Sequence, residues 1–380
     1  MQIHEQPSEN NRSYRNSNPI FVRCFLQIWK KPTNEETLKV GVIVTSTGVG
    51  AYLGEQSLKG IEFALEEINN TGGVNGRKVE IVVEDSKTEP AAAVNAINKL
   101  INVDGVHFII GDSWTSTTAS MVPVANKNEV ILISPIATLD DLAQDDFFFR
   151  TLPTIKNLMQ PLAEYLYENK NVRTVAFLRS DTPFGVEHVK DFTEAFVTLG
   201  GTVVAEEGFP ISSTDVRSQI AKVKLKNPDA IFNLHASGPR VGLLIRQAQE
   251  LNVNPVWIGT YASENDALIK EYSNEIEGLI YPYPYIVDPS NPSAQKFIES
   301  FTQKYNEYPD LTVVNSYDAF KILLSAINSA GEDPYAIKKY LLNMSNYQGA
   351  SGTLSFDENG DVLKPIFIKE VHEGKFIQAQ

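Results

Sequence analysis

The chain of 380 residues is 42% hydrophobic and carries 33 basic against 47 acidic residues, a formal net charge of −14. This length is more than one compact core usually supports, so two domains are expected. The acidic balance argues against binding to nucleic-acid phosphates or to an anionic membrane surface. The single cysteine, Cys24, excludes an internal disulfide and a cysteine-based metal cluster.

Residues 1–37 differ in character from the rest of the chain. A polar stretch up to residue 18 is typical of disorder, and the apolar burst PIFVRCFLQIW that follows contains Arg23. A signal peptide has its basic residues before an uninterrupted apolar core, which is not the order found here. The segment is therefore either a soluble cytosolic tail or an atypical export and linker segment. The linker KKPTNEET, leading directly into a folded domain, favours the second interpretation.

Short runs rich in Val and Ile then alternate with segments of helical periodicity. Such nearly continuous apolar runs are typical of parallel strands buried on both faces. The first series of expected strands covers 39–44, 78–83, 106–110 and 130–133, and the second covers 174–178, 202–207, 230–234, 256–259 and 278–281. The pattern predicts an α/β protein with two doubly wound, Rossmann-like lobes.

The order of the later segments predicts that the chain returns to both lobes. The rhythm breaks at 147–154, and a Pro- and Tyr-rich segment, two helices, a hairpin in GTLSFDENGD and a last strand in FIKEV follow the second series. We expect a first lobe of 38–152 plus about 283–350, and a second lobe of 153–282 plus about 351–380. Several crossings between lobes form a multi-segment hinge, which suits a cleft that closes on a ligand.

The loop after the first strand, with Gly48, Gly50 and Gly54, invites comparison with a dinucleotide-binding loop. Its pattern is GxGxxxG rather than GxGxxG, and Asp85 lies further along the chain than the usual ribose-binding acid. Tyr52 and Leu53 also stand where phosphate loops have small residues. The loop is better interpreted as a wall of a small-molecule site.

Two more loops follow strands of the first series. Thr115 and Ser116 come after VHFIIG, where hydroxyls and free N–H groups at a helix start favour a carboxylate site. Simple N-capping by one of these hydroxyls is the alternative. Ile136, Ala137 and Thr138 follow VILI and expose backbone and a hydroxyl at the same edge of the sheet.

In the second series, Phe184 follows TVAFLRS, and Tyr261 and Glu264 follow VWIG. An aromatic side chain there could cover a ligand, although packing and solvated surface roles are the simpler explanations. The sequence has no GxSxG motif and no paired nucleophile and base, so an enzyme is not expected. The histidines show no metal-ligand spacing, and neither a metal nor another cofactor is expected.

From Leu38 to the C-terminus the chain resembles the type I periplasmic solute-binding proteins of the leucine/isoleucine/valine-binding family. The resemblance is carried by the order of LKGIEFALEEINNTGGVNGRKVEIVVED, FIIGDSWTST, ISPIAT, FLRSDTPFG, LLIRQAQELN, VWIGTYAS and GTLSFDENGD. No single motif is diagnostic, but their spacing over most of the chain is.

The resemblance implies roles for individual residues. Thr115, with Ala137 and Thr138, would bind a ligand carboxylate, and an aromatic near Tyr52 or Leu53 would line the cleft. The family's second-lobe tyrosine corresponds to Phe184, and its ammonium-binding acid corresponds to Tyr261, with Glu264 three residues away. These departures put a standard aliphatic amino acid in doubt and leave an aromatic or other small carboxylate open.

The resemblance thus implies the substrate-binding component of an ABC transporter, extracytoplasmic and monomeric, capturing an amino acid or related small carboxylate for a membrane permease. Two alternatives remain: a ligand-sensing receptor domain of the same fold, and a nucleotide-dependent enzyme.

Overall fold

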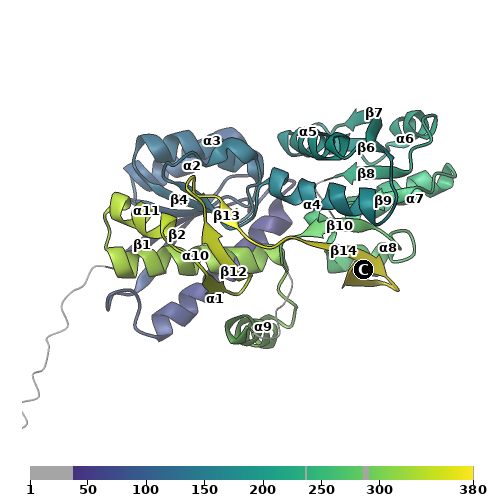
Figure 1. Cartoon of the computed structure of the whole chain (residues 1–380). Helices are drawn as coiled ribbons and strands as arrows, with labels where there is room; N and C mark the ends of the chain where they lie inside the picture. Colours follow the sequence, from purple (N-terminus) through teal and green to yellow (C-terminus); the bar gives the residue numbers. More distant parts are fainter. Residues whose placement is uncertain (1–36, 236–237, 286–290, 380) are drawn as a thin grey trace, which may run out of the picture. The chain divides into compact units, whose positions relative to one another are not determined.

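The structure is a computed structural model, and it describes residues 37–235, 238–285 and 291–379. Figure 1 shows the whole chain coloured along its length. The expected export or linker segment, apart from Thr37, lies outside the described residues. The described part forms one unit that begins at Thr37.

The first lobe is built on a parallel sheet of strand order β2-β1-β3-β4-β5. Its strands are β1 (Leu38–Val44), β2 (Val79–Asp85), β3 (Phe108–Gly111), β4 (Ile131–Ser134) and β5 (Phe148–Arg150). One face is covered by α2 (Pro90–Asn102) and α3 (Thr115–Lys127), the other by α1 (Ala51–Asn70), α10 (Leu311–Ala330) and α11 (Pro334–Leu342) (Figure 1). Strands β1, β3, β4 and β5 are buried on both faces because each face is covered by helices, whereas the edge strand β2 is only partly buried.

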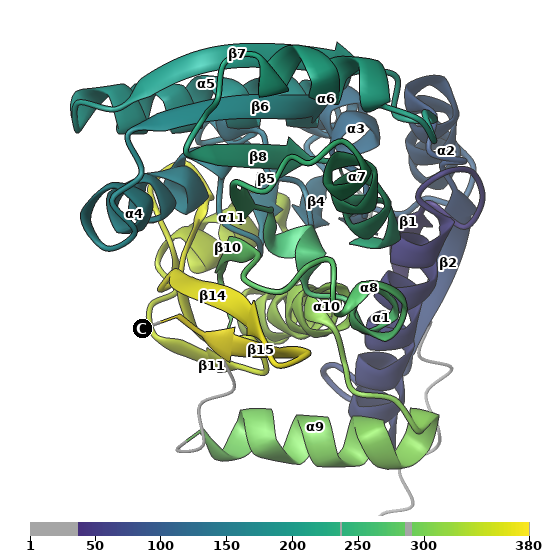
Figure 2. The same ribbon diagram turned by 90° about the vertical axis from the view of Figure 1, so that its right-hand side faces the viewer.

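The second lobe is built on a sheet of order β15-β14-β10-β9-β8-β6-β7. Its parallel strands are β6 (Thr174–Ser180), β7 (Thr202–Phe209), β8 (Ala230–Leu234), β9 (Val256–Ile258) and β10 (Ile280–Tyr283), and β14 (Phe367–His372) and β15 (Lys375–Gln378) add antiparallel strands. The helices are α4 (Ile155–Glu168), α5 (Pro183–Thr198), α6 (Arg217–Lys224), α7 (Gly238–Glu250) and α8 (Asp266–Tyr272). Helix α4 packs against α5, while α6 and α8 pack against α7 (Figure 2).

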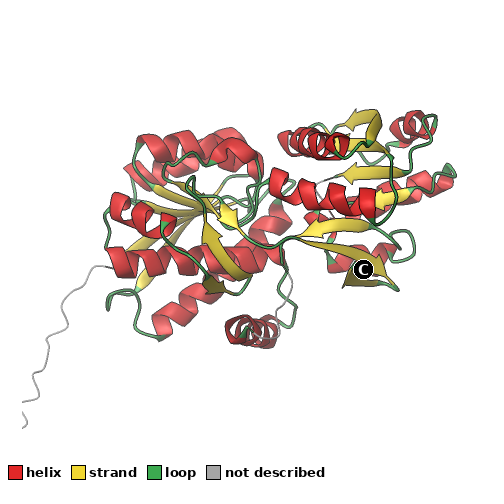
Figure 3. Ribbon diagram, viewed as in Figure 1, coloured by secondary structure: helices red, strands yellow, loops and turns green. Residues whose placement is uncertain are grey.

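The remaining elements are α9 (Pro292–Tyr305), the short helical turns η1 (Asp140–Leu142) and η2 (Tyr261–Ser263), and a small antiparallel sheet. That sheet consists of β11 (Tyr347–Gly349), β12 (Gly352–Phe356) and β13 (Val362–Leu363). Figure 3 shows the alternation of strands and helices that the sequence predicts. The two doubly wound α/β lobes are thereby confirmed.

The structure departs from the sequence expectations at three places. The break at 147–154 contains a fifth strand, β5, and the last strand is followed by β15. The return to the second lobe comes later than residue 351, because Leu354, Phe356 and Val362 belong to the core of the first lobe. The predicted hairpin therefore closes the first lobe, and only β14 and β15 join the second sheet.

No helix among the described residues combines the length and apolar character that crossing a membrane requires.

Candidate functional site

The loop between β1 and α1 is held by Asp85. Its carboxylate accepts hydrogen bonds from the N–H groups of Ser46 (3.0 Å) and Thr47 (3.3 Å) and from the Thr47 hydroxyl (2.7 Å). A Cβ on Gly54 would lie 2.2 Å from the Thr45 carbonyl oxygen, so this glycine lets α1 approach the end of β1. Asp85 and Gly54 thus maintain the loop itself, which weighs against a dinucleotide site.

Tyr52 and Leu53 lie in the first turn of α1. Tyr52 is half-exposed, and its hydroxyl donates to Asp310 Oδ2 at 3.1 Å, while Leu53 is partly buried. Burial raises the pKa of Asp310, although the hydrogen bonds from Val313 and Tyr52 oppose the rise. Tyr52 therefore contacts the start of α10.

Thr115 and Ser116 begin α3, directly after β3. Trp114 occupies the cap position and provides no side-chain cap, so the capping role considered for Thr115 and Ser116 is not what the structure shows. Thr115 is buried and Ser116 partly so. An uncapped helix start carries partial positive charge and N–H donors, which favour an anion.

An acid of this chain lies beneath the same helix start. Asp112 is fully buried and accepts hydrogen bonds from the Thr117 hydroxyl (2.6 Å) and the Ser113 N–H (2.5 Å). Burial raises the pKa of Asp112 to about 6. The Asp112 carboxyl therefore holds its proton to a higher pH than an ordinary aspartate does.

The loop after β4 lies against the loop after β3. The Ser134 hydroxyl donates to the Asp112 carbonyl at 3.0 Å and accepts from the Ala137 N–H at 3.0 Å. Ile136, Ala137 and Thr138 are all buried. The structure thus brings together the two first-lobe loops that the sequence singled out.

Arg150, which the sequence reasoning missed, shapes this second loop. The side chain is fully buried and donates to the carbonyl oxygens of Leu139 (2.5 Å) and Asp140 (2.9 Å), and it pairs with Asp361 (2.5 Å). The signal in the sequence was an arginine within the apolar run FFFR. Its partners lie on loops whose proximity only the fold reveals.

Aromatic side chains of the second lobe meet the first-lobe loops. The rings of Phe184 and Tyr261 pack edge to face with centroids 6.3 Å apart, and Phe184 also packs on His188 at 4.1 Å. Burial raises the pKa of the Tyr261 hydroxyl, which the nearby Thr138 hydroxyl partly offsets. In the described structure the Thr138 hydroxyl forms no well-aligned hydrogen bond. Thr138 and Tyr261 therefore lie at one of the places where the two lobes meet.

The partners of Glu264 are residues of the second lobe. Its carboxylate forms an ion pair with Lys369 of β14 and accepts from the Tyr281 hydroxyl at 2.8 Å. Burial raises the pKa of Glu264, and Lys369 and Tyr281 act against the rise. Its negative charge is already neutralised inside the protein.

A hollow of about 650 Å³ lies elsewhere, beside α11. It is lined by Ala336, Lys339, Tyr340, Asn343, Met344, Ser345 and Tyr347. None of these residues was predicted to bind a ligand, and the hollow contains none of the loops that end the parallel strands.

Comparison with known proteins gives the same assignment as the fold. The family described as "Periplasmic binding protein" matches residues 37–375. The leucine-, isoleucine-, valine-, threonine- and alanine-binding protein of Pseudomonas aeruginosa is 27% identical over 331 residues, 86% of this chain and 87% of that protein.

Two solved structures agree. A leucine-binding protein LivK from Thermotoga maritima superposes with a TM-score of 0.85 at 29% identity, over 90% of this chain and 98% of the other. A branched-chain amino acid transporter substrate-binding protein, LivJ of Streptococcus pneumoniae, was solved in complex with isoleucine. It gives a TM-score of 0.82 at 25% identity, over 90% of this chain and 100% of the other. The chain therefore belongs to the periplasmic binding protein family, and within it the chain is similar to leucine/isoleucine/valine-binding proteins.

Proposed function

We propose that this protein captures an amino acid or a related small carboxylate between its lobes and delivers it to the permease of an ABC transporter. The observation that carries the proposal is the buried apolar cluster in which Ile136 of the first lobe meets Phe184 and Tyr261 of the second, beside the uncapped start of α3. The names of the Pseudomonas and Streptococcus relatives, which state amino acid binding, support the ligand class. In this role the protein works outside the cytoplasm, as a monomer.

The ligand carboxylate binds at the start of α3. Thr115 supplies a hydroxyl and the first turn supplies N–H donors, and the Ala137–Thr138 loop lies beside them. Phe184 and Tyr261 supply an aromatic wall from the second lobe. Apolar walls with a few polar groups that fix orientation are typical of small-molecule sites.

A thermal-shift screen of the full chain against amino acids, aromatic acids and the corresponding amides tests the proposal. Leucine, 4-methylpentanoate and leucinamide form one matched set, and phenylalanine, 3-phenylpropanoate and phenylalaninamide form another. A bound ligand raises the unfolding temperature by mass action. We expect at least one carboxylate to stabilise the protein and its amide to fail. Equal stabilisation by acid and amide would contradict the carboxylate site, and stabilisation by NAD alone would contradict the whole proposal.

Thr115→Ala tests the assignment of the helix start. The lost hydroxyl leaves a carboxylate oxygen without a partner, which costs about 1–3 kcal/mol of binding free energy. Calorimetry with the best ligand of the screen measures the loss. Thr198→Ala on an exposed position of α5 is the matched control and is expected to bind normally. Unchanged affinity of the Thr115 variant would show that the carboxylate binds elsewhere.

Delivery to a permease has its own test. A strain that lacks this protein is expected to lose uptake of the labelled ligand and to regain it with the wild-type chain. Unaltered uptake, with ligand binding intact in vitro, would favour a sensing role over transport.

A further inference from the structure

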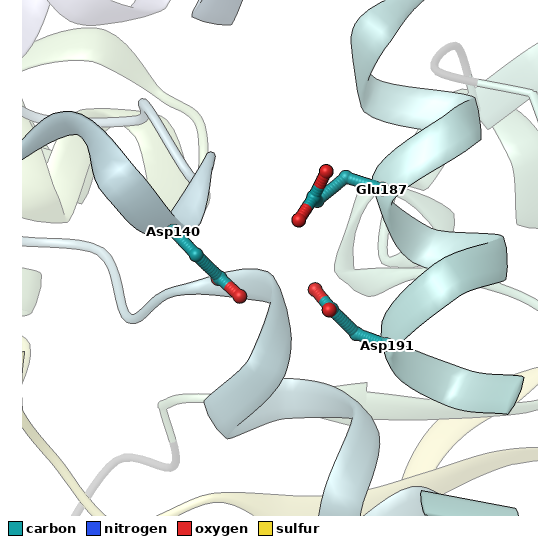
Figure 4. Close-up of side chains that lie close together, drawn as sticks. All are labelled: Asp140, Glu187 and Asp191. Atoms are coloured by element: carbon teal, nitrogen blue, oxygen red, sulfur yellow. The ribbon is translucent and has the colours of Figure 1, made fainter. Parts of the chain in front are cut away.

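Three carboxylates from two distant parts of the chain converge beside the ligand loops. Asp140 belongs to η1 of the first lobe, and Glu187 and Asp191 lie four residues apart on one face of α5 in the second. One oxygen of each lies within 4.8 Å of the others. Figure 4 shows Asp140 reaching toward Glu187 and Asp191 from the opposite side of a common space.

Asp191 is the buried member of this carboxylate cluster. The residue is 4% exposed, and its Oδ2 atom has no hydrogen-bond partner within the described parts of the chain. A buried carboxylate oxygen without a partner is costly. Figure 4 shows the Asp191 carboxylate directed into the space that it shares with Asp140 and Glu187. The structure thus holds an acceptor that requires a positively charged or proton-donating partner there.

Lys190 only partly balances the cluster. Its ammonium lies 2.6 Å from Glu187 Oε1 and 3.7 Å from Asp191 Oδ1, and its side chain is 58% exposed. One exposed lysine cannot neutralise three carboxylates. Burial, followed by the charges of Asp140 and Glu187, raises the pKa of Asp191 to about 7.

We propose that Asp140, Glu187 and Asp191 bind a divalent cation of the calcium type that links the two lobes. Carboxylate oxygens are the ligands that hard divalent cations prefer, and Ca²⁺ accepts irregular sets completed by water. Two oxygens on opposite sides of a Ca²⁺ ion are about 4.8 Å apart, and those around Mg²⁺ about 4.1 Å. Oxygens that all lie within 4.8 Å of one another are compatible with a shared Ca²⁺ ion.

The position of the site connects it to ligand binding. Asp140 lies two residues after Thr138, and Glu187 lies three residues after Phe184. Arg150 holds the Asp140 carbonyl at 2.9 Å, and the Lys156 N–H donates to Asp140 Oδ1 at 3.1 Å, so the first-lobe ligand is fixed in place. A cation bound by both lobes stabilises the arrangement in which they meet. By linkage it raises the affinity for any ligand whose binding requires that arrangement.

A proton shared between Asp140 and Asp191 is the competing explanation of the same geometry. It also relieves the repulsion between the carboxylates, but it needs no metal ion and does not involve Glu187. The bound cation therefore predicts a specific response to added calcium at neutral pH, and the shared proton predicts none.

The experiment is a calorimetric and thermal-shift titration of the chelator-treated full chain with CaCl₂ alone, at pH 7.5. MgCl₂, and KCl at equal ionic strength, serve as controls. We expect calcium to bind at one site and to raise the unfolding temperature more than magnesium does, with no effect of KCl. A calcium response equal to that of KCl would overturn the proposal in favour of the shared proton.

Variants locate the site. Asp191→Asn and Glu187→Gln are each expected to weaken calcium binding at least tenfold. Lys190→Gln removes the competing ammonium and is expected to tighten binding several-fold, a gain that a merely destabilised fold would not produce. Glu194→Gln, at an exposed position of the same helix, is the matched control and is expected to bind calcium normally. An equal loss in the Glu194 and Glu187 variants would show nonspecific charge screening, and would also overturn the proposal.

Discussion

At the scale of single residues, Glu264 illustrates how a predicted ligand group is used by the protein itself. Its carboxylate is bound to Lys369 and to the Tyr281 hydroxyl. A ligand ammonium would have to displace Lys369 from a largely buried position, and Lys369 is only 8% exposed. We therefore expect the carboxylate to be the anchoring group of the ligand, and we expect the choice between amino acids and other acids not to depend on Glu264.

Glu264→Gln is expected to leave ligand affinity unchanged within about twofold, because the charge that it removes is already neutralised. Lys369→Met is expected to lower the free energy of unfolding by about 2–4 kcal/mol, since it leaves a buried carboxylate unpaired. Combining the two substitutions is expected to recover part of that loss. Calorimetry and urea unfolding measure the two effects. A large loss of affinity in Glu264→Gln would return this acid to the ligand site.

The sequence predicted those site residues that follow strand ends, and the structure places Thr115 and Thr138 at one edge of the first sheet. Their ligand contacts stay predictions. Arg150 and Lys369 were not predicted, because their partners Asp361 and Glu264 are distant in sequence. Local patterns report which strand a residue follows. They do not report which charged groups the fold brings together.

At the scale of elements, the central strands were predictable because burial on both faces leaves an unbroken apolar run. β5 and β15 were missed for different reasons. β5 has three residues, too few for a periodic pattern, and it lies at an edge of the sheet. β15 pairs antiparallel with β14 at the other sheet's edge and is only partly buried, so its sequence carries little apolar signal. The close packing of α1 on α10 was likewise invisible in the sequence.

Gly60 allows that packing. A Cβ at this position would lie 2.3 Å from the Val313 carbonyl oxygen of α10, so Gly60→Ala forces the two helices apart. We expect an overpacking cost of about 1–3 kcal/mol in the free energy of unfolding, which exceeds the gain of up to about 1 kcal/mol in helix propensity. Urea unfolding measures the difference. Glu62→Ala, exposed on the same helix, is the control and is expected to change stability by less than about 0.5 kcal/mol. A more stable Gly60 variant would show that the helices are not in close contact.

At the scale of the whole molecule, the chain visits each lobe more than once, and buried polar contacts fix where the segments cross. Thr151 donates to the Asn315 carbonyl at 3.1 Å, and Lys364 donates to the Asn315 side chain at 2.8 Å. The chain passes between the lobes near Thr151 and near Lys364, and both of these segments are therefore anchored to α10. The late boundary near Lys364, rather than residue 351, follows from the apolar side of β12, which packs into the first-lobe core. The contact between the lobes then depends on the side chains that face each other there, among them Asp140, Glu187 and Asp191.

The carboxylate cluster makes that meeting sensitive to pH. An unfolded aspartate has a pKa of about 3.9, whereas the pKa of Asp191 in the folded protein is raised to about 7 by burial and by Asp140 and Glu187, against the opposing charge of Lys190. At pH values between these two pKa values, the folded state therefore holds a proton that the unfolded state has released. In chelated buffer this contribution to stability is fully present below pH about 4 and is lost as the pH rises through about 7.

From the size of its pKa shift, Asp191 is expected to lower the free energy of unfolding by about 2–4 kcal/mol between pH 4 and pH 8. Asp191→Asn keeps the shape of the side chain without titrating, so the difference between wild-type and variant urea midpoints isolates this group from the others that titrate. The wild type is expected to lose stability relative to Asp191→Asn as the pH rises, whereas relative to Glu194→Gln the difference stays flat. Saturating calcium is expected to reduce the pH dependence, because a bound cation compensates the ionised carboxylates. A wild type that gains stability relative to Asp191→Asn over this range would mean that the ionised form of Asp191 is favoured in the fold, and that the cluster is not a site of unbalanced charge.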